Sequence, residues 1–186
     1  MREPQVGQID GVRLTLRLAR PVDAEFVFGL RSDIRYNRYL SSVSGTVQDQ
    51  TEWLQNYCER EAAGEEFYYI ILRRDTGRPC GVVRLYEIAG DQFTWGSWVL
   101  NNDKPPKAAL ESAVLSYEIA FEGLGLVTSY FDARLGNSRA ISFYRRFGAI
   151  EIARDERDVF FKYTAKQFAM DKNRHMKLLQ EKGPDR

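Results

Sequence analysis

The sequence predicts an α+β fold in which a mixed, mostly antiparallel sheet of six to seven strands is flanked by about four helices. Two observations carry this prediction. Three segments rich in β-forming residues follow one another in the middle of the chain with short turns between them, which is typical of an antiparallel meander. The helical segments lie singly before and after the meander, and this order argues against a doubly wound parallel sheet.

A single domain is expected over residues 1–186. The chain is long enough to bury one core, and its 44% hydrophobic and 28% charged residues are typical of an ordinary globular protein. We expect the core to span about residues 12–164, and a C-terminal tail to run from about 165 to 186.

The composition excludes several classes of function. The net charge is +1, so no overall field recruits nucleic acid or a membrane surface, and neither is expected as a partner. The apolar runs are too short to span a bilayer, and the N-terminus lacks the apolar stretch of a secretory signal, which favours a cytoplasmic protein. Cys58 and Cys80 match no metal or redox spacing and are expected to be buried thiols. His175 is the only histidine, so a zinc site with several imidazoles is impossible; we expect no metal and an exposed His175.

The first elements follow from their patterns. Residues 12–19 alternate apolar and polar side chains, which predicts a strand. Pro21 then opens a helix. Residues 32–42 are predicted to be a loop or a broken helix. Thr46 caps a further helix over residues 47–64, in which apolar side chains recur at helical spacing.

The three strands of the meander are expected at residues 66–74, 80–88 and 93–100, joined by turns with the sequences DTGRP and AGDQ. Apolar residues at helical spacing then predict a helix over 107–125, and a strand follows at 126–135.

The last elements are a helix and a hairpin. Asn137 or Ser138 caps a helix over residues 138–148. Residues 149–155 and 158–165 form the two strands of the hairpin. The remaining tail is expected to begin as a helix and then fray.

The join between the third meander strand and the next helix, LNNDKPPKAALESAVL, has unusual chemistry. A helix N-terminus exposes free N–H groups and the positive end of the helix dipole, so it binds anions where it opens onto a cavity. The join contains no glycine, and its two prolines lack donors. Lys104 and Lys107 add positive charge beside the amides of Lys107, Ala108 and Ala109. The join therefore predicts an anion site with more side-chain charge than usual, or alternatively a plain loop with solvated lysines.

A second stretch, ARLGNSRAISFYRRFGA, predicts a capped amphipathic helix whose apolar face carries one hydroxyl, that of Tyr144. A phenol with a pKa of about 10 can protonate a leaving thiolate of slightly lower basicity when it is well positioned. Tyr144 is therefore a candidate general acid, and the alternative is that it is an ordinary core residue.

Taken together, these two stretches resemble the GCN5-related N-acetyltransferase (GNAT) superfamily. GNSRAISFYRRFGAIEI is similar to its later motif, an Asn followed by a helix with a Tyr and a glycine near its end. The resemblance extends from about Val12 to Thr164. The family's pyrophosphate signature has Arg or Gln, then Gly, then Gly or Ala; here Lys104, Lys107 and Ala109 stand at these positions, and only Ala109 fits.

The resemblance implies an acyltransferase that moves an acetyl group from acetyl-CoA, as a co-substrate, to a primary amine. The backbone of Val99 and Leu100 would pair with the pantetheine arm as an added strand, and an N–H near Val99 would polarise the carbonyl. Tyr144 would donate its proton to the CoA sulfur. The other implied cofactor contacts are Lys104, Lys107, Ala108, Ala109 and Asn137.

The general base is harder to place. Relatives often carry a Glu on the strand over residues 93–100, but the corresponding residue here is Thr94, which cannot serve. Glu87 is the candidate, acting through a water held by Tyr86 or Ser97, and the alternative is that Glu87 is a surface carboxylate.

The acceptor is expected to be a small-molecule amine. Two neighbouring branches of the superfamily resemble the chain, one acting on nucleotide-linked amino sugars and one on protein N-termini, including those of ribosomal proteins. Aromatic faces for stacking and a guanidinium for a diphosphate favour the amino-sugar branch; the candidates are Arg31, Tyr39, Tyr86 and Trp95. Two alternatives stay open, a protein N-terminal acetyltransferase and a non-catalytic binding module with this fold. The protein is expected to be a monomer or a homodimer.

Overall fold

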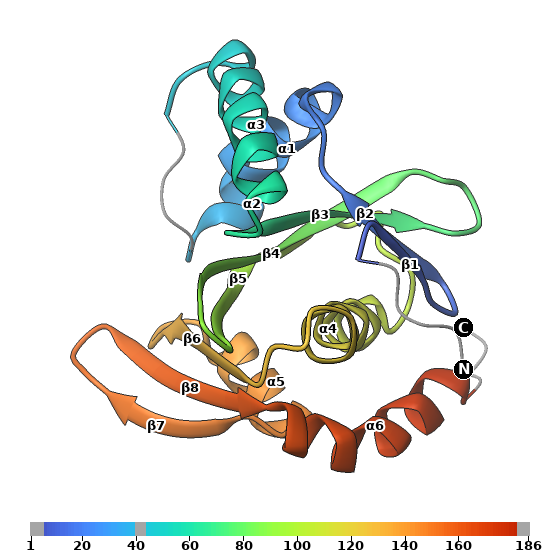
Figure 1. The fold of residues 1–186 in the computed structure, drawn as a ribbon, viewed down its shortest axis with the longest axis vertical. Helices are drawn as coiled ribbons and strands as arrows, with labels where there is room; N and C mark the ends of the chain where they lie inside the picture. Colours follow the sequence, from blue (N-terminus) through green and yellow to red (C-terminus); the bar gives the residue numbers. More distant parts are fainter. Residues whose placement is uncertain (1–5, 40–43, 182–186) are drawn as a thin grey trace.

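The computed structural model describes residues 6–39 and 44–181. Within them, eight strands form one sheet in the order β1-β2-β3-β4-β5-β6-β8-β7 (Figure 1). All neighbouring strands are antiparallel except β5 and β6, which are parallel. The strands are β1 (Gln8–Asp10), β2 (Leu14–Leu18), β3 (Phe67–Arg73), β4 (Pro79–Ala89), β5 (Gln92–Leu100), β6 (Thr128–Arg134), β7 (Ile150–Arg154) and β8 (Asp158–Thr164). The predicted α+β class is confirmed, with eight strands in place of six to seven.

Six α-helices flank this sheet in the described part of the chain, where about four were expected. They are α1 (Ala24–Ser32), α2 (Ile34–Asn37), α3 (Val47–Ala62), α4 (Ala108–Glu118), α5 (Ser138–Phe147) and α6 (Ala165–Gln180). The short α2 and the long α6 account for the difference. The break after Ser32 confirms the broken helix predicted in this region, although residues 40–42 of that prediction lie outside the described residues.

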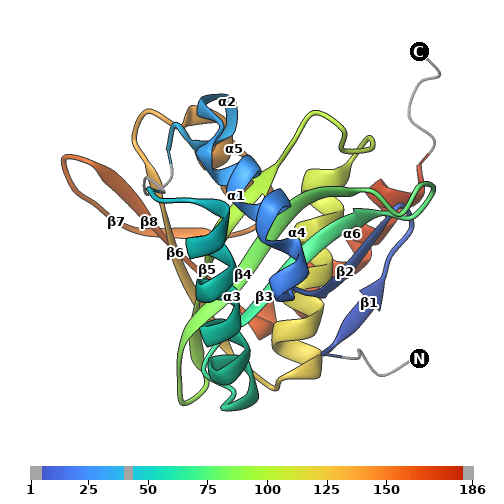
Figure 2. The same cartoon turned by 90° about the horizontal axis from the view of Figure 1, so that it is seen from above.

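The helices cover the two faces of the sheet separately, with α1 and α3 on one face and α4 and α6 on the other (Figures 1 and 2). Alternation along the strands divides the buried side chains between two cores accordingly. On β4, for example, Val82 belongs to the core under α1 and α3, whereas Val83 and Leu85 belong to the core under α4.

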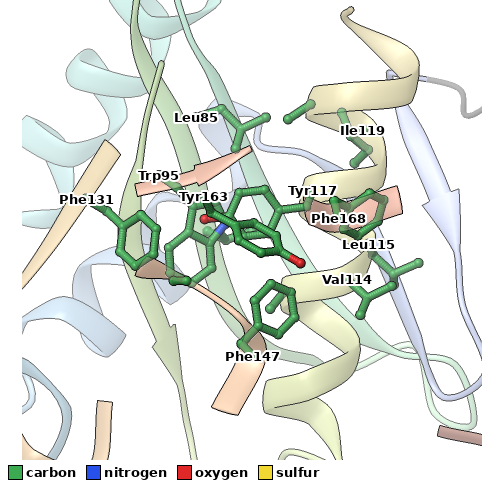
Figure 3. Packing of buried hydrophobic residues seen from close by; sticks show 14 of the residues in the cluster. Leu85, Trp95, Val114, Leu115, Tyr117, Ile119, Phe131, Phe147, Tyr163 and Phe168 are labelled. Atoms are coloured by element: carbon green, nitrogen blue, oxygen red, sulfur yellow. The ribbon is translucent and has the colours of Figure 1, made fainter. Parts of the chain in front are cut away.

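The larger core is dominated by aromatic rings (Figure 3). Trp95 stacks on Tyr117 with 5.5 Å between ring centroids, and Tyr117 stacks on Phe147 at 5.6 Å. Burying each such side chain stabilises the fold by about 1.5–3 kcal/mol. This core fixes β5, α4 and α5 relative to one another, which are the elements on which the candidate site depends.

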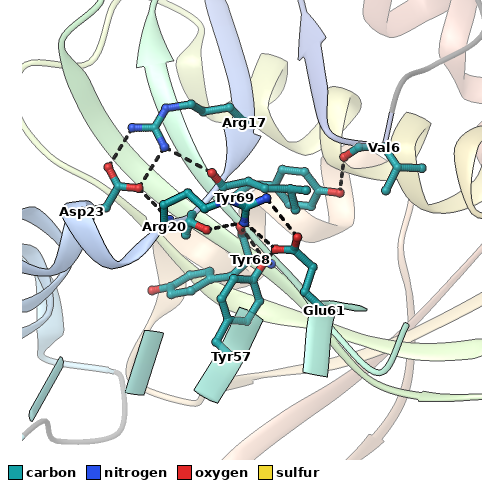
Figure 4. Close-up of polar contacts among 10 residues, drawn as sticks. Val6, Arg17, Arg20, Asp23, Tyr57, Glu61, Tyr68 and Tyr69 are labelled. Atoms are coloured by element: carbon teal, nitrogen blue, oxygen red, sulfur yellow. Dashed lines mark hydrogen bonds and ion pairs between the residues drawn. The ribbon is translucent and has the colours of Figure 1, made fainter. Parts of the chain in front are cut away.

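On the opposite face, a polar network ties the first helices to the sheet (Figure 4). Asp23, just before α1, accepts two hydrogen bonds from the guanidinium of Arg17 on β2, at 2.7 and 2.8 Å. The carboxylate of Glu61 on α3 accepts two hydrogen bonds from the guanidinium of Arg20, at 2.8 and 3.0 Å. The buried hydroxyl of Tyr57 accepts the N–H of Tyr68 on β3 at 2.9 Å. These contacts hold α1 and α3 on β2 and β3.

The two parallel strands separate along their length. β5 pairs with β6 only through Gln92, Phe93 and Thr94. Beyond them β6 stays paired with β8, while residues 95–100 of β5 stay paired only with β4. A bulge at Ser97, whose φ is +46°, bends β5 within this stretch. The sheet therefore opens into a wedge between β5 and β6.

Two predictions for the C-terminal part of the chain were wrong. His175 is not exposed: it is 1% exposed and stacks on Phe147 with 4.5 Å between ring centroids. The tail does not fray after its start, because α6 continues to Gln180 and buries Phe168, His175 and Leu179 at helical spacing. Its docking face was missed because histidine, counted as a surface residue, interrupts the apolar pattern.

The remaining expectations concern thiols, metals and membranes. Cys80 is buried as predicted, while Cys58 is only partly buried, and both are free. The described residues contain no group of three or more His, Cys, Asp or Glu that could hold a metal ion. Among the same residues, no helix has the length and apolar character needed to cross a membrane.

Candidate active site

A cavity of about 520 Å³ fills the wedge between β5 and β6. Its walls come from five regions of the chain, namely the α2 region, β5, the turn before α4, β6 and α5. Of the lining residues, Trp95 and Tyr144 belong to the core under α4, and Tyr36 packs against the core under α1 and α3. The cavity therefore has walls from both faces of the sheet, at the place where β5 and β6 separate.

The turn before α4 forms one end of this cavity, where Lys104 and Ala109 are part of the lining. Lys107 is the residue before the helix and has φ +63°, a left-handed conformation that usually requires glycine. Within the described part of the chain, no side chain accepts a capping hydrogen bond at the start of α4. Among the described residues, no acceptor takes a hydrogen bond from the N–H of Lys107, Ala109 or Leu110. The turn thus keeps the shape of a glycine-containing anion site, with free donors, although glycine is absent.

Two of the predicted cofactor residues are otherwise engaged. The N–H of Ala108 donates to the carbonyl of Pro105 at 3.3 Å, and its side chain is buried outside the cavity lining. The Nζ of Lys107 donates to the carbonyls of Leu178 and Glu181, at the end of α6, and does not line the cavity. Of the two predicted lysines, only Lys104 lines the cavity, and its Nζ donates to the carbonyl of Asn101 at 3.3 Å.

The open edge of β5 forms another wall, to which Val99 and Leu100 both contribute. Asn101 donates its N–H to the carbonyl of Cys80 on β4. Since hydrogen-bonding directions alternate along a strand, the N–H of Val99 also faces β4 and that of Leu100 faces the open edge. The N–H group that was expected near Val99 to polarise the carbonyl therefore belongs to a residue next to Val99, such as Leu100.

The start of α5 forms the opposite wall. Asn137 caps this helix, because its Oδ1 accepts the N–H of Ala140 at 3.2 Å, and it also lines the cavity. The helix ends at Gly148, which has φ +114°. Capping at both ends holds the helix, and with it Tyr144, in one position.

Tyr144 lies on the inner face of α5 with its ring packed at edge-on angles against Phe131 and Trp95, at 4.9 and 5.9 Å between centroids. The residue is 9% exposed and lines the cavity, and its hydroxyl has no hydrogen-bond partner among the described residues. Burial, and next the negative charge of Asp132, raise the pKa of Tyr144. The phenol is therefore protonated at neutral pH and is a weaker acid than an ordinary tyrosine, so its donation to a thiolate depends on close positioning.

Asp132 is the only carboxylate among the described residues that line the cavity. It lies on β6 two residues beyond Tyr130, the last β6 residue paired with β5. Asp132 is exposed to solvent at the cavity. Partial desolvation of its carboxyl by the surrounding walls, and next the negative charge of Asp158, raise the pKa of Asp132. Sequence reasoning missed it, although its position between the buried Phe131 and Ala133 on a strand was a usable signal.

The mouth of the cavity is positively charged. Among the described residues of the lining, five are cationic and only Asp132 is a carboxylate; the five are Arg35, Lys104, Arg134, Arg139 and Arg146. Arg35 is paired with Asp33 at 2.5 Å and Arg134 with Asp158 at 3.0 Å. The charge of the lining favours an anionic ligand such as a phosphate ester.

Other predicted residues are placed differently. Glu87 is exposed outside the lining, in a bulge with φ +52°, and accepts the hydroxyl of Thr94 at 2.6 Å. Tyr86 is outside the lining, although a Cβ built on Gly96, which lines the cavity, would be 3.1 Å from its hydroxyl. Arg31 is also outside the lining. A β-bulge lies at Glu87, where the register between β4 and β5 shifts.

Of the aromatic residues predicted to bind the acceptor, Trp95 and Tyr39 line the cavity, the first as a buried residue and the second as a partly exposed one. Trp95 is 2% exposed and donates its Nε1–H to Ser116 at 2.9 Å, so it is mainly a core residue that forms the floor. Tyr39 packs over Gly136, where a Cβ would be 3.3 Å from the ring. Tyr36 accepts the N–H of Asn102 at 3.3 Å. The α2 region therefore contacts both the turn after β5 and the turn before α5.

Comparisons with known proteins agree with this geometry. A family model described as an acetyltransferase (GNAT) domain matches residues 13–150. A solved structure described as apo FdhC, a nucleotide-linked sugar GNAT, is 37% identical, covers 92% of this chain and 98% of its own, and superposes with a TM-score of 0.86. Among curated proteins, the sequence comparison finds no significant match.

More distant structures show the fold alone. A ribosomal-protein-S5-alanine acetyltransferase from Vibrio fischeri is 12% identical, with a TM-score of 0.74 and coverage of 84% of this chain and 96% of its own. A variant of the SpeG spermidine N-acetyltransferase from Vibrio cholerae is 17% identical, with a TM-score of 0.71 and the same two coverages. With a family model over residues 13–150 and a 37% identical relative over nearly all of its length, the chain belongs to the GNAT family of acetyltransferases.

Proposed function

We propose that the protein transfers an acetyl group from acetyl-CoA to a primary amine on a nucleotide-linked amino sugar. The observation that carries this proposal is the cavity through the sheet, which has free helix N–H groups at one end and an acid–base pair, Tyr144 and Asp132, inside. The choice of acceptor draws on the 37% identical relative, which is described as a nucleotide-linked sugar GNAT.

The residues present fit acetyl-CoA. The N–H groups of Ala109 and Leu110 and the ammonium of Lys104 would hold the pyrophosphate, since a helix N-terminus and a cation both favour a phosphate. The open edge of β5 at Leu100 has an N–H and a carbonyl with no strand beside them, which suits the amides of the pantetheine arm. Asn137 lies across the wedge, where its side-chain amide can donate to the same arm.

Acetyl-CoA supplies the thioester whose carbonyl carbon the amine attacks. Asp132 takes one proton from the ammonium form of the acceptor, and its raised pKa makes it a better base than an ordinary carboxylate. Open-edge N–H groups of β5 next to Val99 donate to the carbonyl oxygen as negative charge develops there. Tyr144 gives its proton to the sulfur as the C–S bond breaks, and it recovers one from the newly bonded nitrogen. The products are the amide, the free thiol and one proton, which Asp132 releases to solvent.

Asp132 thus replaces Glu87 as the proposed general base. Glu87 keeps an indirect influence, because its charge is among those that raise the pKa of Asp132.

The acceptor would enter from the α1 side. Tyr36 and Tyr39 offer aromatic faces on which a sugar or a base can stack, and Arg35 and Arg134 lie near them in the lining. A guanidinium matches the oxygens of a diphosphate. These contacts support an acceptor that carries a nucleoside diphosphate over a simple amine.

Two measurements test the proposal in sequence. Thermal denaturation with acetyl-CoA comes first: at 100 times its Kd, a ligand of the native state adds about 2.7 kcal/mol of stability. No shift at millimolar concentration would favour a non-catalytic module. Thiol release is then measured with amino-sugar nucleotides, the matching free amino sugars and N-terminal peptides. Turnover confined to the peptides would overturn the proposed acceptor.

A further inference from the structure

Lys107 occupies a conformation that its residue type disfavours. Three non-glycine residues of the described chain have a positive φ, namely Glu87, Ser97 and Lys107. The first two lie in β-bulges, whereas Lys107 has φ +63° and ψ +10° directly before α4. A side chain with a Cβ is strained there, so surrounding contacts must hold it.

The contacts that hold Lys107 come from the C-terminal end of the chain. Its Nζ donates to the carbonyl of Leu178 and, at 2.6 Å, to that of Glu181. The last carbonyls of a helix have no partner within it and form the negative end of the helix dipole, so an ammonium is well placed there. The side chain of Lys107 therefore caps α6 from a distance of more than 70 residues in sequence.

A second cation joins the same end of α6 to β2. Arg13 donates from its guanidinium to the carbonyl of Leu179 at 3.0 Å. The backbone N–H groups of Arg13 and Leu14 donate in turn to the buried carboxylate of Glu111 on α4, at 2.7 and 3.0 Å. The end of α6, the start of β2 and the first turn of α4 thus form one connected unit beside the cavity.

We propose that Lys107 is a positioning residue, through which the end of α6 keeps the turn before α4 left-handed and its free N–H groups directed into the cavity. The ligand of those N–H groups is the pyrophosphate of acetyl-CoA, and this part rests on the proposed function. The ammonium of Lys107 does not itself contact the phosphates, because it is committed to two carbonyls and lies outside the cavity lining.

Three substitutions separate this role from a direct phosphate contact. Lys107→Gly removes the side chain but takes a positive φ without strain, so acetyl-CoA affinity should stay within about twofold of the wild type. Lys107→Met keeps the Cβ and loses both hydrogen bonds, so affinity should fall by roughly three- to tenfold. Lys107→Arg can still donate to the carbonyls and should stay near the wild type. Equal losses in the Gly and Met variants, growing as salt is lowered, would instead show a phosphate contact.

Amide hydrogen exchange without ligand tests the same role independently of the proposed function. The N–H of Glu111 donates to the carbonyl of Lys107 at 3.0 Å, and that of Glu181 to Lys177 at 3.1 Å. In Lys107→Met both amides should exchange faster, and in Lys107→Gly only that of Glu181 should. Unchanged exchange at both amides in Lys107→Met would overturn the positioning role. Failure of the wild type to bind acetyl-CoA, with the expected exchange pattern, would overturn only the proposed function.

Discussion

Two helix N-termini border the same cavity, and they are built in opposite ways. α5 begins at Asn137, whose side chain accepts an N–H of the first turn. α4 follows Lys107, whose side chain caps nothing in this helix, and the N–H groups of Ala109 and Leu110 have no acceptors among the described residues. At a capped helix end a side chain accepts a hydrogen bond from the first-turn N–H groups, whereas at an uncapped end these N–H groups need a ligand or water as the acceptor. The difference indicates that α4 binds the anion and that α5 serves another purpose.

We infer that α5 serves to fix the position of Tyr144, the proposed general acid. α5 is capped at both ends and packs Tyr144 against Phe131 and Trp95. Asp132 on β6 stands close enough for its charge to raise the pKa of Tyr144. We therefore expect substitutions at the α5 and β6 end to change kcat, and substitutions at the α4 end to change the affinity for acetyl-CoA.

The largest effect is expected at Tyr144. Tyr144→Phe keeps the ring contacts but removes the proton donor, so kcat should fall by roughly 10²- to 10⁴-fold, the range for a lost general acid. The Kd of acetyl-CoA should hardly change, because the helix donors are intact. Steady-state kinetics and calorimetric binding measure the two quantities.

Tyr163→Phe is the matched control for this variant. Tyr163 belongs to the same aromatic core, and its hydroxyl donates to Asp171 at 3.3 Å, away from the cavity lining. This control should lose some stability and keep its kcat. Equal kcat in Tyr144→Phe and the wild type would remove Tyr144 from the acid role.

Asp132 should give the next largest effect. Asp132→Asn removes the proposed base with little change in shape, and kcat/KM should fall by about 10²-fold or more. The acidic limb of the pH profile should also disappear, because it reports the titration of this carboxyl. Glu87→Gln is the paired test, since Glu87 is exposed outside the cavity lining. A larger loss from Glu87→Gln than from Asp132→Asn would restore Glu87 as the base.

Asp132 and Glu87 show which parts of the fold and the site could be predicted from the sequence. The order of elements followed from hydrophobic periods and turn residues, so the meander, the final hairpin and α5 were predicted. β1 was missed because three residues carry no period. Glu87 was chosen by its position on a strand, but a bulge turns it outward, and the backbone conformation of a bulge is not encoded in an alternating pattern.

Long-range contacts explain the rest of the site. Tyr144, Asn137, Lys104 and Ala109 were expected near the cofactor, and all four line the cavity. The role of Lys107 depends on carbonyls at the far end of the chain, and that of Asp132 on where β5 and β6 separate. Both are properties of tertiary packing, which local propensity does not report.

A smaller effect is expected at the α4 end. Lys104→Ala removes the one lysine that lines the cavity, so the Kd of acetyl-CoA should rise by about three- to tenfold, more at low salt, with kcat unchanged. Lys177→Ala is the control, because Lys177 lies on α6 outside the lining. A fall in kcat without a change in Kd would contradict the division between the two ends.

At the α5 end, the cap should matter for stability. Asn137→Ala removes the acceptor for the N–H of Ala140 and should cost about 1 kcal/mol of unfolding free energy. Asn137→Asp keeps an acceptor and should recover most of that loss. Urea denaturation measures both variants. If Ala and Asp are equally unstable, the cap does not hold α5 in place.

The smallest effect on stability is expected at the contact between α6 and the end of α5. His175 on α6 stacks on Phe147, the last residue of α5, and neither ring nitrogen has a hydrogen bond of normal geometry among the described residues. Burial, and next the positive charge of Arg174, lower the pKa of His175 below its usual value of 6.5; Asp171 and the backbone of Phe147 oppose this only in part. The unfolded chain therefore takes up the proton first as pH falls.

The sign of the pH dependence follows from that order. Above about pH 6.5 both states are neutral at this residue, and its contribution to stability is constant. Between pH 6.5 and the lower pKa of the folded state, only the unfolded chain is protonated, so stability falls as the solution becomes more acidic. His175→Phe keeps an aromatic ring on Phe147 and removes the titration. The difference in unfolding free energy between variant and wild type, measured in urea from pH 7.5 to 5, should change only below about pH 6.5, in favour of the variant. A difference that stays constant over the whole range would mean that α6 holds α5 in place without a titrating contact at His175.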